Sequence, residues 1–132
     1  MGATVNSELS GKVAIVTGAG RMRGIGRATA VILARMGSNV VVTGTGRNPD
    51  TFPNDEKDVG WRDIDSTVEE IQANGVRGLP LIVDVSREKD VHRMIDSTVD
   101  EFGRLDIIVN NAAAPYGPDR VPVLDLTADV FK

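Results

Sequence analysis

The hydrophobic positions of the chain form short apolar runs that alternate with stretches of helical periodicity. Four runs rich in valine, isoleucine and leucine are typical of buried strands and cover residues 12–17, 39–43, 79–83 and 105–109. The stretches between them end near Gly37, Gly75 and Gly103, as helices commonly do. Strands that alternate with helices in this way predict an α/β fold with a doubly wound parallel sheet and right-handed crossovers.

Each predicted helix has one apolar face. The helix at 25–36 has Ile25, Thr29, Ile32, Leu33 and Met36 on this face; the next has Ile64, Val68 and Ile71; the third has Val91, Met94, Ile95, Thr98, Val99 and Phe102. Ser86 is predicted to cap the third helix, and Thr127 a further helix near the end.

Two stretches carry no such pattern. Residues 47–63 are polar and contain Pro49, Pro53 and Gly60, so they are predicted to lack regular elements. This stretch is long for a connection in a compact domain, which predicts either a functional flap or a partly mobile segment. Residues 110–124 contain three prolines and are predicted to be a loop.

Composition narrows the possible functions. The length of 132 residues fits one domain, and 41% hydrophobic with 26% charged residues is an ordinary globular composition. A net charge of -4 argues against nucleic-acid and membrane-surface partners. The chain has no cysteine and one histidine, so disulfides and thiolate catalysis are excluded and a zinc site is not expected. Without a secretory signal or a long apolar run, a cytoplasmic location is expected.

A glycine-rich loop joins the first strand to the first helix. The strand ends at Gly18 and the helix begins near Gly24. Such a loop exposes backbone N–H groups at the positive end of a helix dipole, and its glycines let the backbone approach a pyrophosphate. The alternative is a tight turn that binds no ligand. The loop follows the first strand directly, which favours the ligand-binding interpretation over this alternative.

Three motifs in this order resemble the short-chain dehydrogenase/reductase family. Thr17-Gly18 with Gly24-Ile25-Gly26 resembles its Thr-Gly-x-x-x-Gly-x-Gly turn, and Asp84-Val85 resembles its adenine-contacting Asp-Val. Residues 110–113 (Asn-Asn-Ala-Ala) resemble its Asn-Asn-Ala-Gly. The resemblance implies a Rossmann-type sheet of which four strands are present. It also implies one dinucleotide-binding domain over 1–132, which ends before the catalytic Ser, Tyr and Lys and is inactive alone.

The resemblance also implies roles for individual residues. Gly18, Gly24 and Gly26 would shape the pyrophosphate turn, with the backbone of Ile25. Asp84 would accept a hydrogen bond from the adenine amino group, and the N–H of Val85 would donate to the ring. Asn110 would pin neighbouring strands and border the cofactor, with Ala112 beside it. The chain departs from the pattern because five residues, 19–23, separate Gly18 from Gly24 where the family usually has three, and because Ala113 replaces a glycine.

The end of the second strand bears on the choice of cofactor. Gly44 stands where relatives that use NAD usually carry an aspartate, and no carboxylate follows before Asp50. Thr45 and Arg47 could meet a 2′-phosphate, and Arg23 is similar to a basic residue of NADP-dependent members. These features predict NADP(H). NAD(H) is the alternative, because a carboxylate of the 48–63 segment could turn back onto the ribose: Asp50, Asp55, Glu56 or Asp58.

The resemblance implies hydride transfer between a nicotinamide and a small-molecule carbonyl or secondary alcohol, in a homo-oligomer (a dimer or tetramer). Alternatives are a non-catalytic nucleotide-binding module and a fold that takes another adenine nucleotide. Tyr116 and Arg120 have the spacing of a Tyr-x-x-x-Lys pair. They are not predicted to be catalytic, because Gly117 and Pro118 prevent the helix that would bring the two side chains together. His92 is predicted to be a surface residue. Trp61 either anchors its segment to the sheet edge or contacts a partner.

Overall fold

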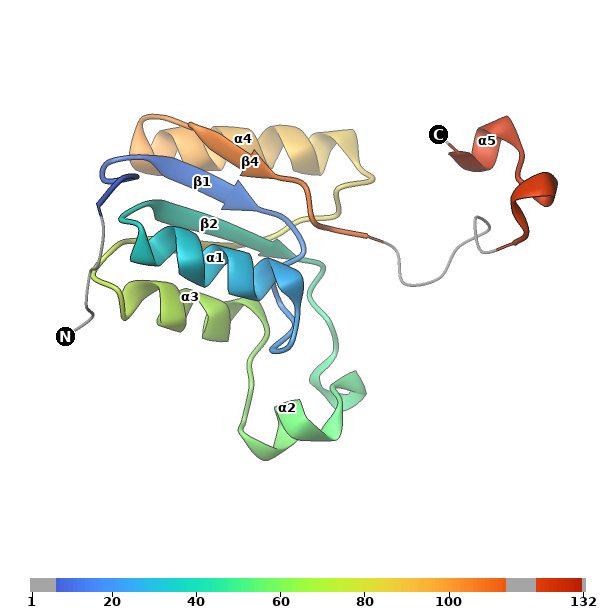
Figure 1. The fold of residues 1–132 in the computed structure, drawn as a ribbon, viewed down its shortest axis with the longest axis horizontal. Helices are drawn as coiled ribbons and strands as arrows, with labels where there is room; N and C mark the ends of the chain where they lie inside the picture. Colours follow the sequence, from blue (N-terminus) through green and yellow to red (C-terminus); the bar gives the residue numbers. More distant parts are fainter. Residues whose placement is uncertain (1–6, 114–120, 132) are drawn as a thin grey trace.

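Four parallel strands form one sheet in the order β3-β2-β1-β4, in a computed structural model that describes residues 7–113 and 121–131 (Figure 1). The strands are β1 (Val13–Val16), β2 (Asn39–Gly44), β3 (Gly78–Ile82) and β4 (Ile107–Val109). In the centre of the sheet, Val16 of β1 aligns with Val42 of β2 and Val109 of β4. The predicted parallel sheet is confirmed, although β3 begins one residue before the predicted 79–83 and β4 is shorter than 105–109.

Helices cover both faces of the sheet (Figure 1). Helices α1 (Ile25–Arg35) and α3 (Ile64–Gln72) pack on one face, and α4 (Glu88–Phe102) packs on the other. Alternate strand residues serve the two faces, because successive side chains of a strand point in opposite directions. Val16 joins the cluster with α1 and α3, while Ile15 joins the cluster with Met94 of α4. The sheet is therefore doubly wound, as predicted.

The buried face of α1 differs from the prediction. Its buried residues are Gly26, Ala30 and Ala34, whereas Ile25 is 78% exposed and Ile32 is 53% exposed. The three small residues are spaced four apart and so lie on one side of the helix. They let α1 approach the strands closely, as the third glycine of a dinucleotide-binding turn does in general. The predicted face was wrong for the two isoleucines because size, not hydrophobicity, decides which residues fit here.

The start of α4 also differs from the prediction, and so does Val99 of its predicted apolar face, which is 43% exposed, whereas the end of the helix agrees. Met94 and Thr98 are buried and Phe102 packs against them, but Ser86 is not the cap. Arg87 occupies the capping position without a side-chain hydrogen bond to the helix, and Ser86 instead bonds the Asp84 carboxylate. The helix ends at Gly103, which has a left-handed backbone.

Residues 47–63 are not devoid of regular structure. A short 3-10 helix, η1 (Pro49–Thr51), is followed by α2 (Asn54–Asp58). The prediction of an irregular stretch was therefore wrong, and the segment also contains two buried side chains, Phe52 and Glu56. The prolines start helical turns here instead of preventing them, because the first position of a helix needs no N–H donor.

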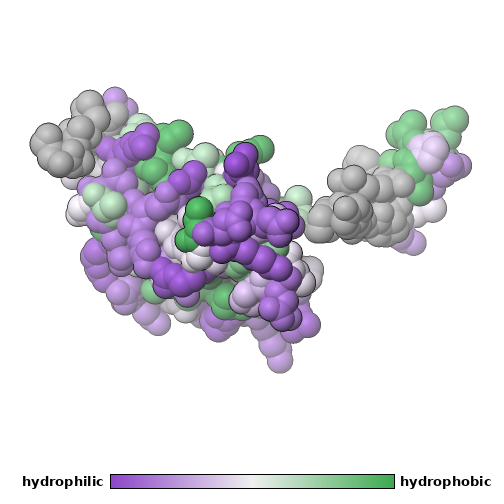
Figure 2. Space-filling view, turned by 90° about the horizontal axis from the view of Figure 1, so that it is seen from below, coloured by the Kyte–Doolittle hydropathy of each residue, from purple (hydrophilic) through white to green (hydrophobic). Residues whose placement is uncertain are grey.

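The last described elements are η2 (Val123–Asp125) and α5 (Ala128–Phe131), which starts directly after Thr127 as predicted. They lie apart from the sheet (Figure 1). Figure 2 shows hydrophobic surface at this end, where Val123 is 76% and Leu124 95% exposed. Within residues 7–113 and 121–131, no helix combines the length and the apolar character needed to cross a membrane.

Candidate functional site

A cleft of about 720 Å³ lies at the carboxyl ends of the strands. Its walls come from the loop after β1, the end of β2, the end of β3 and the turn after β4. The strand order reverses at this point, because β2 and β3 lie on one side of β1 and β4 lies on the other. In open α/β sheets, ligands bind at such a switch point.

The loop after β1 needs glycine at two positions. Gly18 has a φ of 68°, and a Cβ on it would lie 2.7 Å from the Cα of Ala112. A Cβ on Gly26 would lie 2.6 Å from the carbonyl oxygen of Gly18. The first turn of α1, which follows Gly24, contains no acidic residue and no side-chain cap. Gly24 and Ile25 at this helix start line the cleft, and a helix N-terminus without an acidic side chain in its first turn favours an anion.

Asn111 ties the turn after β4 to the end of β1. Its Nδ2 donates to the carbonyl oxygens of Thr17 at 3.2 Å and Gly18 at 3.0 Å. The Thr17 hydroxyl in turn accepts from the backbone N–H groups of Asn111 and Ala112, both at 3.1 Å. The resemblance implied this pinning role for Asn110, whereas in the structure Asn111 makes the contacts. Asn110 itself is exposed and makes no side-chain hydrogen bond within the described part of the chain.

Asp84 and Val85 line the cleft at the end of β3. The Asp84 Oδ1 accepts from the backbone N–H of Ser86 at 2.9 Å and from its hydroxyl at 2.6 Å. These two bonds, followed by the nearby Arg87 guanidinium, lower the pKa of the Asp84 carboxyl below its ordinary value. Asp84 is thus a carboxylate near neutral pH and can accept a hydrogen bond from an amino group.

A cluster of charges also lines the cleft after β2. The Arg47 guanidinium donates to Asp63 Oδ1 from Nε at 3.0 Å and from Nη2 at 2.8 Å, and Nη2 also bonds Glu56 Oε1 at 3.0 Å. The Phe52 ring covers the guanidinium, with its centroid 4.4 Å away. The side chains of Glu56 and Asp63 are 3% and 12% exposed, so this ion-pair cluster is shielded from solvent.

The lengthened 19–23 loop and the 47–63 segment are in contact with each other. Trp61 donates from Nε1 to the carbonyl oxygen of Gly20 at 2.7 Å, and Glu56 Oε2 accepts from the backbone N–H of Met22 at 2.9 Å. Arg23 pairs with Asp55 at 2.7 Å. The 47–63 segment therefore holds the lengthened 19–23 loop, and Trp61 anchors it to that loop.

Most of the predicted site residues lie together. Eight of them line the cleft: Gly18, Gly24, Ile25, Thr45, Arg47, Asp84, Val85 and Ala112. Gly26 lies beneath the loop, whereas Arg23 and Asn110 do not line the cleft. No role was predicted from the sequence for Asp63 or Asn111, which also line the cleft, as do Gly20 and Arg21 of the lengthened loop. Asp63 had one signal, since it is the polar residue directly before the apolar periodicity of α3.

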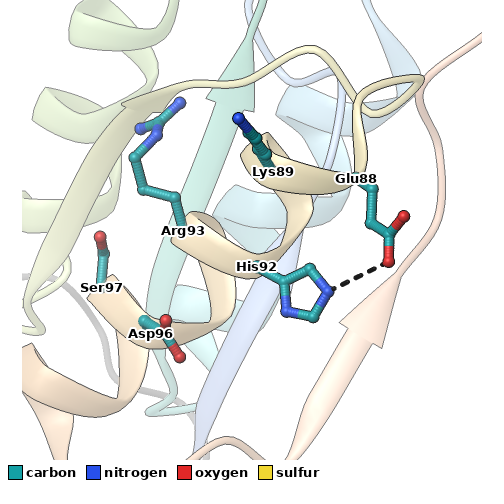
Figure 3. A pocket seen from close by; sticks show the side chains of 6 residues that line it. All are labelled: Glu88, Lys89, His92, Arg93, Asp96 and Ser97. Carbon is teal, nitrogen blue, oxygen red and sulfur yellow. Dashed lines mark ion pairs between the residues drawn. The ribbon is translucent and has the colours of Figure 1, made fainter.

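A second hollow, of about 550 Å³, lies on the outer side of α4 (Figure 3). It is lined by charged side chains of one helix, and His92 Nε2 lies 3.5 Å from Glu88 Oε1. The His92 side chain is 72% exposed, which confirms the predicted surface position. No group of side chains suited to a metal ion occurs in the described ranges. Tyr116 and Arg120 lie outside the described residues.

Comparisons with known proteins agree with this geometry. Residues 12–132 match the family model described as short chain dehydrogenase. The chain is 43% identical over 122 residues to the short chain dehydrogenase/reductase astE of Aspergillus oryzae, covering 92% of this chain and 40% of that protein. It is 40% identical to versicolorin reductase 1 of Dothistroma septosporum, covering 96% of this chain and 41% of that protein.

A solved structure shares the fold. Carveol dehydrogenase from Mycobacterium avium, in complex with NAD, superposes with a TM-score of 0.68 at 27% identity. The match covers 96% of this chain and 43% of that one. The chain thus spans about two fifths of the length of the curated relatives and of this structure.

Proposed function

Because the chain belongs to the short-chain dehydrogenase family, we propose that it forms the dinucleotide-binding part of an NAD(P)-dependent oxidoreductase. The reaction is hydride transfer between C4 of the nicotinamide and a carbonyl or secondary alcohol of a small-molecule substrate. The observation that carries the proposal is the cleft in which the uncapped N-terminus of α1 and the carboxylate of Asp84 line the same hollow.

The residues of the chain have separate tasks in this proposal. The N–H groups at the start of α1 and the loop at Gly18 hold the pyrophosphate, for which close backbone approach is required. Asp84 accepts from the adenine amino group while the backbone of Val85 borders the ring. Asn111 keeps the turn after β4 against Thr17 and so fixes the wall of the cleft on the nicotinamide side.

The choice between NADP(H) and NAD(H) is the finer part of the proposal. NADP(H) was predicted from Gly44 in place of an acidic residue, and from Arg23, Arg47 and the Thr45 hydroxyl as phosphate ligands. Both arginines are engaged in ion pairs, Arg23 with Asp55 and Arg47 with Glu56 and Asp63. A 2′-phosphate would have to compete with these carboxylates. The cytoplasmic location and the homo-oligomeric assembly stay predictions of the sequence.

The test uses Trp61, the only tryptophan of the chain, which lies against the glycine loop. Titration with NADH and with NADPH is followed by quenching of Trp61 emission and by calorimetry. At least one dinucleotide is expected to bind. Gly18→Ala is expected to weaken binding at least tenfold, which is about 1.4 kcal/mol, because its Cβ would meet Ala112.

Gly11→Ala is the matched control. Gly11 also has a positive φ, of 80°, but a Cβ there meets nothing within 4 Å. Both substitutions therefore strain the backbone, and only one of them changes the cleft. Failure of both dinucleotides to bind the wild-type protein would refute the proposed function.

A further inference from the structure

The carboxylate of Asp63 fills the space beside Gly44 at the end of β2. A Cβ on Gly44 would lie 3.3 Å from Asp63 Oδ2. Asp63 comes from the start of α3, yet it reaches the cleft and is only 8% exposed. An acidic group at the end of the second strand is what binds the ribose 2′-hydroxyl of NAD in dinucleotide-binding folds generally. Here that position holds a carboxylate supplied by a residue nineteen positions further along the chain.

The backbone of Asp63 is held in an unfavourable conformation. Its φ of 59° makes it the only non-glycine residue with a positive φ in the described part of the chain. Such residues persist only where the surrounding contacts fix them, and they are frequent at ligand sites. Arg47 supplies the fixing contact, with two hydrogen bonds to Asp63 Oδ1. Oδ2 accepts no hydrogen bond from the described residues and is the acceptor left for a ligand.

The charges around this position disfavour a phosphate. Arg47, Glu56 and Asp63 together carry one negative charge, because two carboxylates share one guanidinium. The Phe52 ring covers Arg47, whose side chain is 17% exposed. A 2′-phosphate would bring about two further negative charges beside Asp63. Arg21 is the cation that lines the cleft without an ion pair to the described residues, and it lies in the glycine loop, where the pyrophosphate is proposed to bind.

We propose that Asp63 recognises the 2′-position of the adenosine ribose and makes the site selective for NAD(H). Its Oδ2 accepts from the 2′-hydroxyl, and its charge repels the 2′-phosphate of NADP(H). Glu56 and Phe52 position it through Arg47. This inference rests on the proposed dinucleotide site, and it reverses the preference that the two arginines suggested from the sequence.

The experiment measures dissociation constants for NAD⁺ and NADP⁺ on the intact protein by calorimetry. The wild type is expected to bind NAD⁺ at least tenfold more tightly than NADP⁺. Asp63→Asn, which removes the charge and keeps an acceptor for Arg47, is expected to reduce that ratio about tenfold. Asp65→Asn is the matched control, because Asp65 is an exposed carboxylate in the first turn of the same helix, and it leaves the ratio unchanged.

A second variant covers the case in which Asp63→Asn does not fold. Asp63→Gly relieves the positive φ and removes the carboxylate, and it is likewise expected to shift the ratio toward NADP⁺. Tighter binding of NADP⁺ by the wild type overturns the inference, as does an unchanged ratio in both Asp63 variants. In either case the proposed function survives. If neither dinucleotide binds the wild type, the proposed function itself fails.

Discussion

Removal of the Glu56 charge tests whether the 47–63 segment is fixed to the glycine loop by its buried ion pair. In Glu56→Gln, one side-chain oxygen becomes an NH₂ group. Glu56 accepts from Met22 N–H through Oε2 and from Arg47 through Oε1, so the new NH₂ must face one of these two donors. A buried donor left without an acceptor costs about 1–3 kcal/mol, and weakening the pair to Arg47 adds to this. We expect a total loss of about 2–4 kcal/mol in the free energy of unfolding.

The assay is urea unfolding followed by two signals. Trp61 fluorescence reports the segment itself, because Trp61 bonds Gly20 of the loop, and far-ultraviolet circular dichroism reports the whole domain. With a urea slope of roughly 2 kcal/mol per molar, the midpoint is expected to fall by about 1–2 M. If only the fluorescence transition shifts, the segment detaches before the domain unfolds, and the ion pair stabilises the segment locally.

Glu69→Gln is the matched control for the same chemical change. Glu69 pairs with Arg62 on the surface, where the two side chains are 66% and 55% exposed. Exposed ion pairs contribute about 0–1 kcal/mol, so the expected midpoint shift is small. Equal shifts for Glu56→Gln and Glu69→Gln would refute the argument, because burial would then make no difference to the value of the pair.

Three further predictions concern single contacts, two beside the cleft and one at the other end of the sheet. Gly26→Ala places a Cβ 2.6 Å from Asn111 Nδ2 and is expected to lower the free energy of unfolding by about 1–3 kcal/mol in a thermal melt; an unchanged melting temperature would contradict the close packing of α1. Asn111→Ala should weaken dinucleotide binding and lower stability, whereas Asn110→Ala should do neither, and calorimetry on both variants decides which asparagine matters. The Arg104 guanidinium, followed by a backbone N–H bond, lowers the pKa of Asp106 below its ordinary value of 3.8. The ionised Asp106 therefore stabilises the fold above that pH, and this stabilisation is lost as the pH falls through the lowered pKa. Asp106→Asn should make the loss of stability at acid pH less steep, and an unchanged acid dependence would contradict the assignment.

The sheet could be predicted from the sequence because each strand is a continuous apolar run. Both faces of β1 are buried, Val16 against α1 and α3 and Ile15 against α4, so the run has no polar interruption. The same reasoning misplaced the face of α1. Hydrophobic periodicity favours the large side chains of Ile25 and Ile32, while the close approach of helix and strand selects the small ones that include Ala30.

The cleft was predictable in outline because strand ends and glycine loops are local features. Its charged wall was not, because it is built from contacts between residues distant in sequence. From the sequence, Arg47 was predicted to be available to a phosphate. In the fold, its guanidinium forms ion pairs with Asp63 and Glu56. Which of two adjacent asparagines reaches Thr17 likewise depends on the direction of the backbone after β4, which a sequence pattern does not encode.

The contact between the lengthened 19–23 loop and the 47–63 segment has a consequence for the family as a whole. Trp61, Glu56 and Asp55 each bind a different residue of that loop, so shortening the loop alone would leave the Trp61 N–H and the buried Glu56 carboxylate without these partners. Homologues should therefore have both lengths or neither. A chimaera that grafts the loop onto a relative with a short connection should require the segment to be transplanted with it.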